Sequence, residues 1–560
     1  MVFKKAPALL LFFGFVSALL CALEFDSPGD PAPLARRLAD SMSDEQALAQ
    51  CFMLGWVGAE PSPLILNWIR DRNIGGVKIF GWNTGDTKRL AATVGSLQKA
   101  ALESGFGIPL FVATDQEGGM VRHVKGSTSE TPGNMAIGAS GRPVDAYWSG
   151  YYIGAELSLL GVNMNFAPAV DLYTNRDSVL IGSRSFGNDP VQAGILGAAF
   201  VKGLAAQGVI ATAKHFPGHG DTSLDSHGVL PRIDATFETI WDRELVPYRL
   251  LAREGLAAIM TGHLAFPNTK AGEAPASLSS WFLKDVLREK IGYKGLIITD
   301  DLMMNGATVF AGSLSRAAKQ ALLAGNDVIM LSKTPSLYDP VWTFLLESMK
   351  DDAVFRGRVR DAARRIIEVK LEYLRGENKT PYIPDLKKVE EGLASPESSA
   401  FFLDLAAHSV TIVKDGGVLP LDREKAGRVL LAGQYPDFFS VGKKAYPGAV
   451  SFWYSSQASP EFLYYARNSD TVIFCLSGED GLKPLSALKE LGKRIIVFSV
   501  LSPIYLEGAL WADAAIAVYS YSPDSFIAGF SAMLGRIKAE GKIPFPGDPA
   551  PPGLPPGIGQ

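Results

Sequence analysis

The stretch GLIITDDL, residues 295–302, is a short apolar run that ends in two carboxylates. Seven other short runs of apolar or β-branched residues lie between about residues 45 and 375, each separated from the next by a longer amphipathic stretch. Alternation of this kind predicts repeated βα units, and eight units predict an α/β fold of the (β/α)8 TIM-type barrel class. The predicted strands are Cys51–Trp56, Gly76–Phe80, Leu110–Thr114, Met164–Pro168, Val209–His215, Ala257–His263, Gly295–Asp300 and Asp327–Leu331.

Side chains that can perform chemistry lie at the ends of these runs. Asp115, Asp171, His215, His263 and Asp300 each stand at or just after the last residues of a predicted strand. Barrels of this class build their active sites at the carboxyl ends of the strands. The positions of these five residues therefore support the barrel and indicate where its site lies.

A second, smaller α/β sandwich domain is predicted after the barrel. Its buried strands are expected at Ser409–Lys414, Arg428–Ala432, Thr471–Cys475, Arg494–Val500 and Ala514–Tyr519, with a closing helix over Phe526–Glu540. The polar, proline-containing stretch before it is typical of a linker, and the end of the chain is rich in proline and glycine. The predicted organisation is an export segment at 1–22, a barrel at 35–375, a linker at 376–400, the sandwich domain at 401–545 and a tail, expected to be extended or disordered, at 546–560.

Composition excludes several classes of protein. The 560 residues are 47% hydrophobic and 20% charged, as in folded globular proteins. Lys and Arg number 54 against 58 Asp and Glu, a formal net charge of −4, so nucleic acid is not an expected partner. The three cysteines include no CxxC pair, which excludes a thiolate zinc site.

The amino terminus has the pattern of an export signal. Lys4 and Lys5 precede an apolar run over residues 6–23. Cys21 at the end of this run is similar to the cysteine that becomes lipidated in a bacterial lipoprotein, although Leu20 before it departs from the usual small residue. A cleaved signal, a lipid anchor and an uncleaved anchor all stay open. We expect an exported protein, periplasmic or at the cell surface, with membrane attachment through the amino terminus as one form.

The densest chemical signal is KHFPGHGDTSLDSH, residues 214–227, which holds three of the six histidines. His215 and His219 have the HxxxH spacing of a helical metal site, but the proline and glycines near them oppose a helix, so no metal and no cofactor are predicted. The alternative is a loop after a strand in which Asp225 orients His227. A histidine held in this way can donate and accept a proton near neutral pH.

Two further strand ends carry groups suited to sugar chemistry. Asp300 can act as a nucleophile, as one carboxylate does in retaining glycosidases, while Asp301 is expected to cap the following helix. In the run TDQEGGMVR, residues 114–122, Asp115 and Arg122 suit a ligand with many hydroxyls, and Arg184 could supply a second guanidinium. The sequence has neither a Walker GxxxxGK[ST] motif nor a GxSxG elbow.

Together these motifs resemble glycoside hydrolase family 3, in its β-N-acetylglucosaminidase (β-N-acetylhexosaminidase) branch. Lys214–His227 matches the branch's KHFPGHGDTxxDSH signature, and the resemblance extends over nearly all of residues 45–375. It implies that His227, held by Asp225, is the acid/base and that Asp300 is the nucleophile. It implies further that the sugar is held by Asp115, Arg122, Arg184, Lys214 and His215.

The resemblance predicts a retaining exo-β-N-acetylglucosaminidase acting on glycans such as peptidoglycan fragments or chitin oligosaccharides. Three alternatives stay open: a phosphorylase, because an uncharged histidine repels phosphate less than a carboxylate would; a β-glucosidase of the same family, which usually lacks the histidine loop; and a glycan-binding surface lipoprotein without turnover. A carbohydrate is the expected partner, and neither an oligomeric state nor a role for the second domain follows from the sequence.

Overall fold

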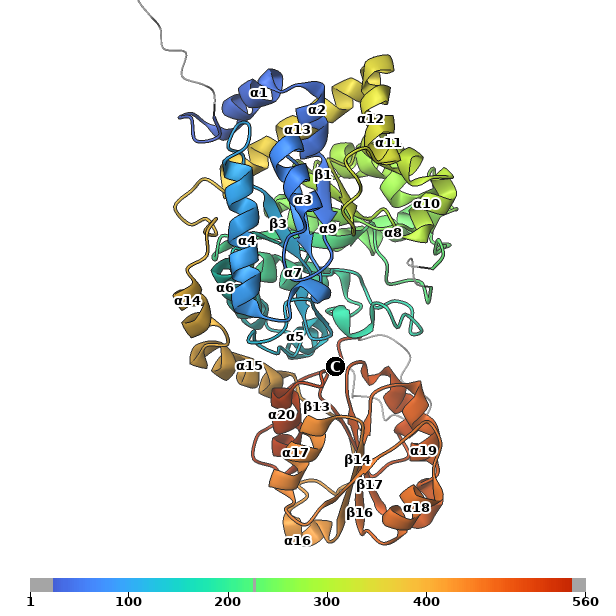
Figure 1. Cartoon of the computed structure of the whole chain (residues 1–560). Coiled ribbons are helices and arrows are strands. Elements are labelled where there is room, and N and C mark those ends of the chain that lie inside the picture. Colours follow the sequence, from blue (N-terminus) through green and yellow to red (C-terminus); the bar gives the residue numbers. More distant parts are fainter. Residues whose placement is uncertain (1–23, 225–227, 546–560) are drawn as a thin grey trace, which may run out of the picture.

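The structure, a computed structural model, describes residues 24–224 and 228–545. It contains a closed barrel of parallel strands and, below it in Figure 1, a separate six-stranded sheet. This architecture confirms the predicted TIM-type barrel followed by a smaller α/β domain. Neighbouring barrel strands follow the order β1-β12-β11-β8-β7-β6-β3-β2. Their bounds are β1 Phe52–Gly55, β2 Gly76–Ile79, β3 Phe111–Thr114, β6 Met164–Asn165, β7 Ile210–Phe216, β8 Ala258–Thr261, β11 Leu296–Asp301 and β12 Val328–Leu331.

The barrel strands are short because each needs only to cross the barrel wall, and they are apolar because helices cover their outer face. Every residue of β1, β2, β3, β8 and β12 is buried. A π-helix, η5 (Trp281–Lys290), lies between β8 and β11 along the chain. The α-helices of this part are α1 Pro31–Ser41, α2 Asp44–Gln50, α3 Pro63–Asn67, α4 Thr87–Leu102, α5 Asn134–Ser140, α6 Pro143–Leu159, α7 Pro190–Ala205, α8 Phe237–Asp242, α9 Leu245–Arg253, α10 Asn305–Ala311, α11 Leu314–Ala324, α12 Pro340–Asp351 and α13 Ala353–Tyr373.

The second domain is a mixed sheet in the order β13-β18-β17-β16-β14-β15, in which β13 is antiparallel to β18 and the other pairs are parallel. One of its strands, β15, was not predicted because it is an exposed edge strand. The predicted closing helix is shorter than expected and ends at Met533. The bounds are β13 Thr411–Asp415, β14 Val429–Gly433, β15 Val450–Trp453, β16 Thr471–Leu476, β17 Arg494–Ser499, β18 Ala514–Ala517, α16 Arg423–Ala426, α17 Pro436–Ala445, α18 Pro460–Arg467, α19 Leu482–Ser486 and α20 Pro523–Met533.

The segment interpreted as a linker, 376–400, is partly helical. It contains α14 (Leu386–Gly392) and the first turn of α15 (Pro396–Ser409). Asp385 and Ser395 cap these helices through side-chain oxygens that accept backbone N–H groups, which is why helices form in a stretch whose composition favours loops. Figure 1 shows both helices running along one side of the molecule from the barrel to the second sheet.

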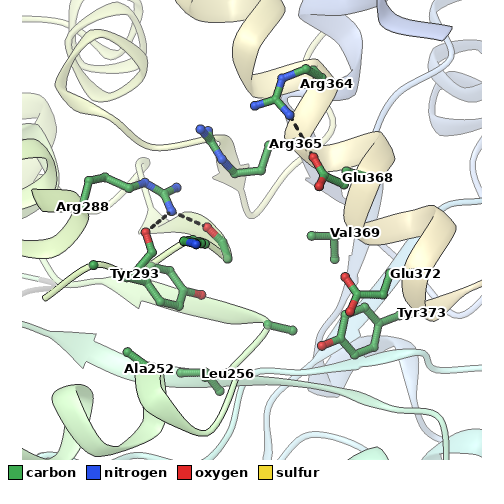
Figure 2. Close-up of a pocket in the computed structure, with 15 residues that line it drawn as sticks. Ala252, Leu256, Arg288, Tyr293, Arg364, Arg365, Glu368, Val369, Glu372 and Tyr373 are labelled. Carbon is green, nitrogen blue, oxygen red and sulfur yellow. Dashed lines mark hydrogen bonds and ion pairs between the residues drawn. The ribbon is translucent and has the colours of Figure 1, made fainter. Parts of the chain in front are cut away.

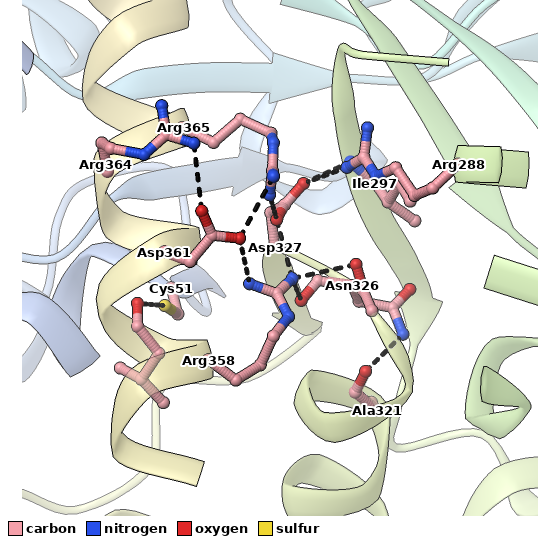
Figure 3. A network of polar contacts seen from close by, with 12 residues as sticks. Cys51, Arg288, Ile297, Ala321, Asn326, Asp327, Arg358, Asp361, Arg364 and Arg365 are labelled. Carbon is pink, nitrogen blue, oxygen red and sulfur yellow. Dashed lines mark hydrogen bonds and ion pairs between the residues drawn. The ribbon is translucent and has the colours of Figure 1, made fainter. Parts of the chain in front are cut away.

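A buried ionic network closes the amino-terminal end of the barrel (Figure 3). The Asp327 carboxylate, just before β12, accepts hydrogen bonds from Arg288 (2.8 Å), Arg358 (2.8 Å) and Arg365 (2.6 Å). It also accepts the N–H of Ile297 on β11 (3.0 Å). Because Arg288 belongs to η5 and the other two arginines belong to α13, this one carboxylate ties two helices to two strands.

Candidate active site

Five of the residues that we predicted as site residues lie at the carboxyl-terminal end of the barrel. Asp115 follows β3, Lys214 and His215 lie in β7, and Asp300 lies near the end of β11. Arg184 ends a single 3-10 turn, Gly182–Arg184, in the loop between β6 and α7. The barrel brings them together because its parallel strands all end at this edge.

A chain of alternating charges links four elements at this end. Lys214 Nζ donates to Asp115 and to Glu117 Oε1, the latter at 2.6 Å. Lys78, on β2, lies 2.8 Å from the other Asp115 oxygen. Arg184 closes the chain with a two-pronged contact to Glu117, Nε at 3.0 Å and Nη2 at 2.7 Å. The fork fixes the guanidinium in position.

These contacts keep the carboxylates ionised although they are buried. Burial alone would raise the pKa of Asp115, but the charges of Lys214, Lys78 and His123 hold it well below its usual value. In the same way burial would raise the pKa of Glu117, but the charges of Arg184 and Lys214 outweigh this effect and lower it. The site therefore presents charged hydrogen-bonding groups over the pH range in which most enzymes work, as recognition of a polyhydroxylated ligand needs.

His215 is oriented by Asp171. Its Nδ1 lies 2.7 Å from Asp171 Oδ2, and the same carboxylate accepts the backbone N–H groups of His215 (3.1 Å) and His219 (2.7 Å). The opposite ring atom, Nε2, is 3.4 Å from Arg184 Nη2, so the ring points into the charged site. No group of three or more His, Cys, Asp or Glu residues among those described is arranged to hold a metal ion.

Asp300 differs from the other carboxylates of this end. Within residues 24–224 and 228–545 it has no ion-pair partner, and its Oδ1 accepts the N–H of Asp301 at 2.8 Å. Burial raises and the nearby His215 and His263 lower its pKa, which ends below the usual value. Asp301 instead accepts the N–H groups of Met303 (3.0 Å) and Ser332 (3.1 Å) and so caps a turn. An ionised, partly exposed carboxylate without a bound cation is suited to attack an electrophilic carbon.

Other predicted site residues lie elsewhere or outside the described part. Arg122 donates to the carbonyls of Thr128 (2.9 Å) and Ser129 (3.0 Å) and pairs with Glu130 (2.8 Å), so it does not join the charge chain around Lys214. Asp225 and His227, the predicted acid/base pair, lie outside the described residues. Their roles stay predictions.

Sequence reasoning missed two members of the site, Lys78 and Glu117. Lys78 lies in the predicted strand Gly76–Phe80 and is fully buried. A lysine inside a buried strand is almost never without a charged partner, and this signal could have identified it. Glu117 lies two residues after Asp115, in the short strand β4 (Gln116–Gly118), and its position gave no comparable signal.

A cavity of about 690 Å³ opens at the opposite end of the barrel (Figure 2). Its wall includes Ala257 and Gly295, the residues just before β8 and β11. Two of its arginine side chains are engaged by neighbours: Arg364 donates to Glu368 (2.8 Å), and Arg288 donates to the Tyr293 carbonyl (3.0 Å). In barrels of this class the amino-terminal end contributes to stability rather than catalysis, so this cavity is not the candidate site.

Comparison with known proteins identifies relatives. Residues 47–369 match the Glycosyl hydrolase family 3 N terminal domain. The chain is 29% identical over 551 residues to Beta-hexosaminidase A of Pseudoalteromonas piscicida, covering 86% of this chain and 90% of that protein. It is 30% identical over 446 residues to Beta-N-acetylglucosaminidase/beta-glucosidase of Cellulomonas fimi, covering 77% and 75%.

Two solved structures share both domains. A glycoside hydrolase family 3 β-N-acetylglucosaminidase from Paenibacillus sp. str. FPU-7 aligns with a TM-score of 0.80 and 28% identity over 90% of this chain and 99% of that one. A fungal multi-domain β-N-acetylglucosaminidase of the same family aligns with a TM-score of 0.83 and 29% identity. This alignment covers 90% of the present chain and 60% of the fungal chain.

Proposed function

Glycosyl hydrolase family 3 is the family to which this chain belongs, and on that premise we propose that it is a retaining exo-β-N-acetylglucosaminidase. Its similarity to these relatives shows that the chain is a β-N-acetylglucosaminidase-like glycosidase. The proposed reaction releases terminal β-linked N-acetylhexosamine from glycans such as peptidoglycan fragments or chitin oligosaccharides.

The observation that carries the proposal is Asp300, a carboxylate without an ion-pair partner among the described residues, at the same barrel end as a chain of charged sugar-binding groups. Asp115, Lys214 and Arg184 are proposed to hold the sugar hydroxyls and the acetamido group. His215, fixed by Asp171, is proposed to join them. Arg122 keeps its place in the proposal only through the family resemblance, because its guanidinium is engaged by residues 128–130.

The proposed mechanism has two steps. Asp300 attacks the anomeric carbon, the bond from that carbon to the leaving oxygen breaks, and His227 gives its proton to that oxygen. His227 then removes a proton from water, the resulting hydroxide attacks the anomeric carbon, and the bond to Asp300 breaks. The sugar leaves with its β configuration, and both side chains return to their starting states.

A second candidate activity, on β-glucosides, is favoured by the relative from Cellulomonas fimi, whose name gives both activities. We propose it as a side activity of the same site. We also propose export through the amino-terminal segment, which lies outside the described residues. No helix in residues 24–224 or 228–545 is long and apolar enough to cross a bilayer.

The test is product analysis by NMR with an aryl β-N-acetylglucosaminide and an aryl β-glucoside, each with and without inorganic phosphate. We expect β-N-acetylglucosamine as the first product and faster turnover of the N-acetylated substrate. An α-configured first product would contradict retention. If a sugar phosphate formed whenever phosphate is present, the reaction would be phosphorolysis and not hydrolysis. If neither substrate were turned over, the enzyme assignment would be contradicted.

A further inference from the structure

The loop of residues 171–188, here called the Arg184 loop, holds two groups of the candidate site on its inner side. Asp171 at its start fixes His215, and Arg184 binds Glu117 and reaches His215. The loop is drawn together because the Ser185 hydroxyl donates to the Asp171 carbonyl at 2.6 Å. A shift of this loop would therefore move His215 and the guanidinium of Arg184 together.

The loop has little regular structure of its own. Between β6 and α7 it contains the single 3-10 turn that ends at Arg184. A segment without a helix or strand takes its position from the surfaces that it contacts. The position of this loop therefore depends on what lies against its outer side.

The second domain contacts the outer side of the loop. The Ser502 hydroxyl donates to the Tyr173 hydroxyl (3.3 Å), and the rings of Tyr173 and Phe545 lie 5.4 Å apart between centroids. Arg176 forms an ion pair with Glu507. Tyr173, buried in the same apolar cluster as residues of the second sheet, thus anchors the loop in the second domain.

The far end of the loop is held by the segment that follows the second sheet. The N–H of Asn188 donates to the Pro544 carbonyl at 3.1 Å. Gly187 lies so close that an added Cβ would be 2.0 Å from the same carbonyl oxygen, and its φ of 134° also favours glycine. The N–H of Tyr173 donates to the Gly187 carbonyl (2.9 Å), so the two anchored points are joined to each other.

From these contacts we infer that the second domain positions the sugar-binding groups Arg184 and His215, acting through the Arg184 loop. Ser502, Phe545 and Glu507 are then positioning residues of the site, although none of them contacts Asp300, Lys214 or Arg184. The inference rests on the proposed function and deepens it, because it gives the second domain a part in substrate binding.

The inference predicts a particular kinetic signature. Groups that hold the sugar equally in the ground and transition states affect KM more than kcat. A general loss of stability has the opposite signature, because it lowers the fraction of folded enzyme and so the apparent kcat, with KM unchanged. Comparing the change in KM with the change in apparent kcat therefore distinguishes positioning of the sugar-binding groups from a general effect on stability.

The test is Phe545→Ala in the full chain, compared with wild type and with Trp453→Ala. Trp453 is a matched control because its ring, like that of Phe545, lies 5.4 Å from another aromatic ring. Its partner, Phe439, belongs to the second domain itself, and Trp453 lies on β15 at the far edge of the sheet. We expect Phe545→Ala to raise KM for an aryl β-N-acetylglucosaminide by about tenfold, with kcat within about twofold of wild type. Trp453→Ala should leave KM unchanged.

A second pair of variants keeps the test informative if Phe545→Ala does not fold. Glu507→Arg places two cations together and should raise KM, and adding Arg176→Glu, which restores the pair in reverse, should bring KM back toward wild type. Equal KM values for wild type, Phe545→Ala and Glu507→Arg would overturn the inference while leaving the proposed function intact. Failure of the wild type to turn over the substrate would instead contradict the proposed function.

Discussion

The two ends of the barrel each hold buried ions, but they use them differently. At the amino-terminal end one carboxylate, Asp327, is surrounded by three arginines that come from helices outside the barrel. At the carboxyl-terminal end the cations Lys78 and Lys214 come from the strands themselves and alternate with carboxylates. The first arrangement satisfies its carboxylate completely, whereas the second leaves Asp300 without a cation among the described residues. One end is built to lock helices to strands, and the other keeps a reactive group available.

The largest effect is expected from removing that available carboxylate. Asp300→Asn should lower kcat/KM by on the order of 10³-fold or more, because it removes the proposed nucleophile for the anomeric carbon. The melting temperature should change little, since the Asp300 side chain accepts a single hydrogen bond from its neighbour Asp301. Steady-state kinetics and thermal denaturation together check both statements.

The adjacent aspartate provides the control for this variant. Asp301→Asn weakens the cap on Met303 and Ser332, so it should lower the melting temperature and spare turnover by the folded enzyme. If Asp300→Asn kept near-normal turnover, the nucleophile would have to be another residue.

The second prediction concerns the amino-terminal end of the barrel, where Asp327 has a full set of partners. Asp327→Asn should cost about 3–5 kcal/mol of unfolding free energy, because it removes the carboxylate that three largely buried guanidinium groups share and leaves Arg358 and Arg365 only the more exposed Asp361. Burial works against the charged form of Asp327, but the arginines overcome it and bring the pKa to about 2. Urea denaturation measures the loss, and kcat of the folded fraction should stay unchanged.

Asp470 is the matched control for this variant. Its pKa is also about 2, set by hydrogen bonds from Arg428, but the pair is exposed and screened by solvent, so Asp470→Asn should destabilise the fold much less than Asp327→Asn. Similar losses for both variants would mean that the three arginines do not depend on Asp327. If Asp327→Asn does not accumulate, Arg365→Gln, which leaves two arginines on the carboxylate, should show a smaller loss of the same kind.

The difference between the ends also explains how much the sequence could predict. All eight barrel strands were located because each is a short apolar run bounded by polar residues, and the site residues Asp115, Lys214, His215 and Asp300 meet because they stand at strand ends. The edge strand β15 was missed although its sequence, VSFW, is largely apolar; it lies at the edge of the sheet and none of its residues is buried.

Contacts between distant segments could not be predicted in the same way. Arg122 was expected to hold the same ligand as Asp115. It lies in the hairpin strand β5 (Val121–Arg122), where the carbonyls of residues 128 and 129 accept its hydrogen bonds, and its role at the sugar stays a prediction. Asp327 was interpreted as the start of a strand, and its three arginine partners, separated from it by 31 to 39 residues, carry no sequence signal of the contact. Such partners depend on how helices pack on the barrel, which local pattern does not specify.

A third and smaller effect is expected at the carboxyl-terminal end, from a carboxylate that, like Asp327, accepts several hydrogen bonds. Asp171 accepts three hydrogen bonds, one from the His215 ring and two from backbone N–H groups, and its pKa is lowered to about 2 because those contacts outweigh burial. Asp171→Asn should reduce kcat/KM by roughly 10²-fold by letting the His215 ring turn. Ser277→Ala, which removes a similar 2.7 Å contact from His263, is the control and should change kcat/KM only a few-fold. Equal losses would show that His215 needs no fixed orientation.

The smallest effect is expected from a carboxyl near the carboxyl-terminal end of the barrel, Glu244, which lacks a full set of hydrogen-bond partners among the described residues. Glu244 packs against Gly218 in the histidine-rich loop, and an added Cβ at Gly218 would lie 2.7 Å from Glu244 Cγ. Its Oε1 pairs with Arg243 at 2.5 Å, while its buried Oε2 has no hydrogen-bond partner among the described residues. Burial raises the pKa of Glu244 to about 7, although Arg243 opposes the rise, so this carboxyl behaves in the opposite way to Asp327.

The sign of the pH effect follows from this raised pKa. Between pH 4.5, the ordinary value for a glutamate, and about 7 the folded state binds more protons than the unfolded state, so stability falls as pH rises through this window. The loss is about 3 kcal/mol at most. Glu244→Gln should flatten the dependence of the urea midpoint on pH between 5 and 7.5, whereas Glu273→Gln, which breaks an exposed pair with Arg232, should leave it unchanged. A wild-type midpoint that rises over this window in parallel with that of Glu244→Gln would show that Glu244 is ionised in the fold, and the two ends of the barrel would then treat their buried carboxyls alike.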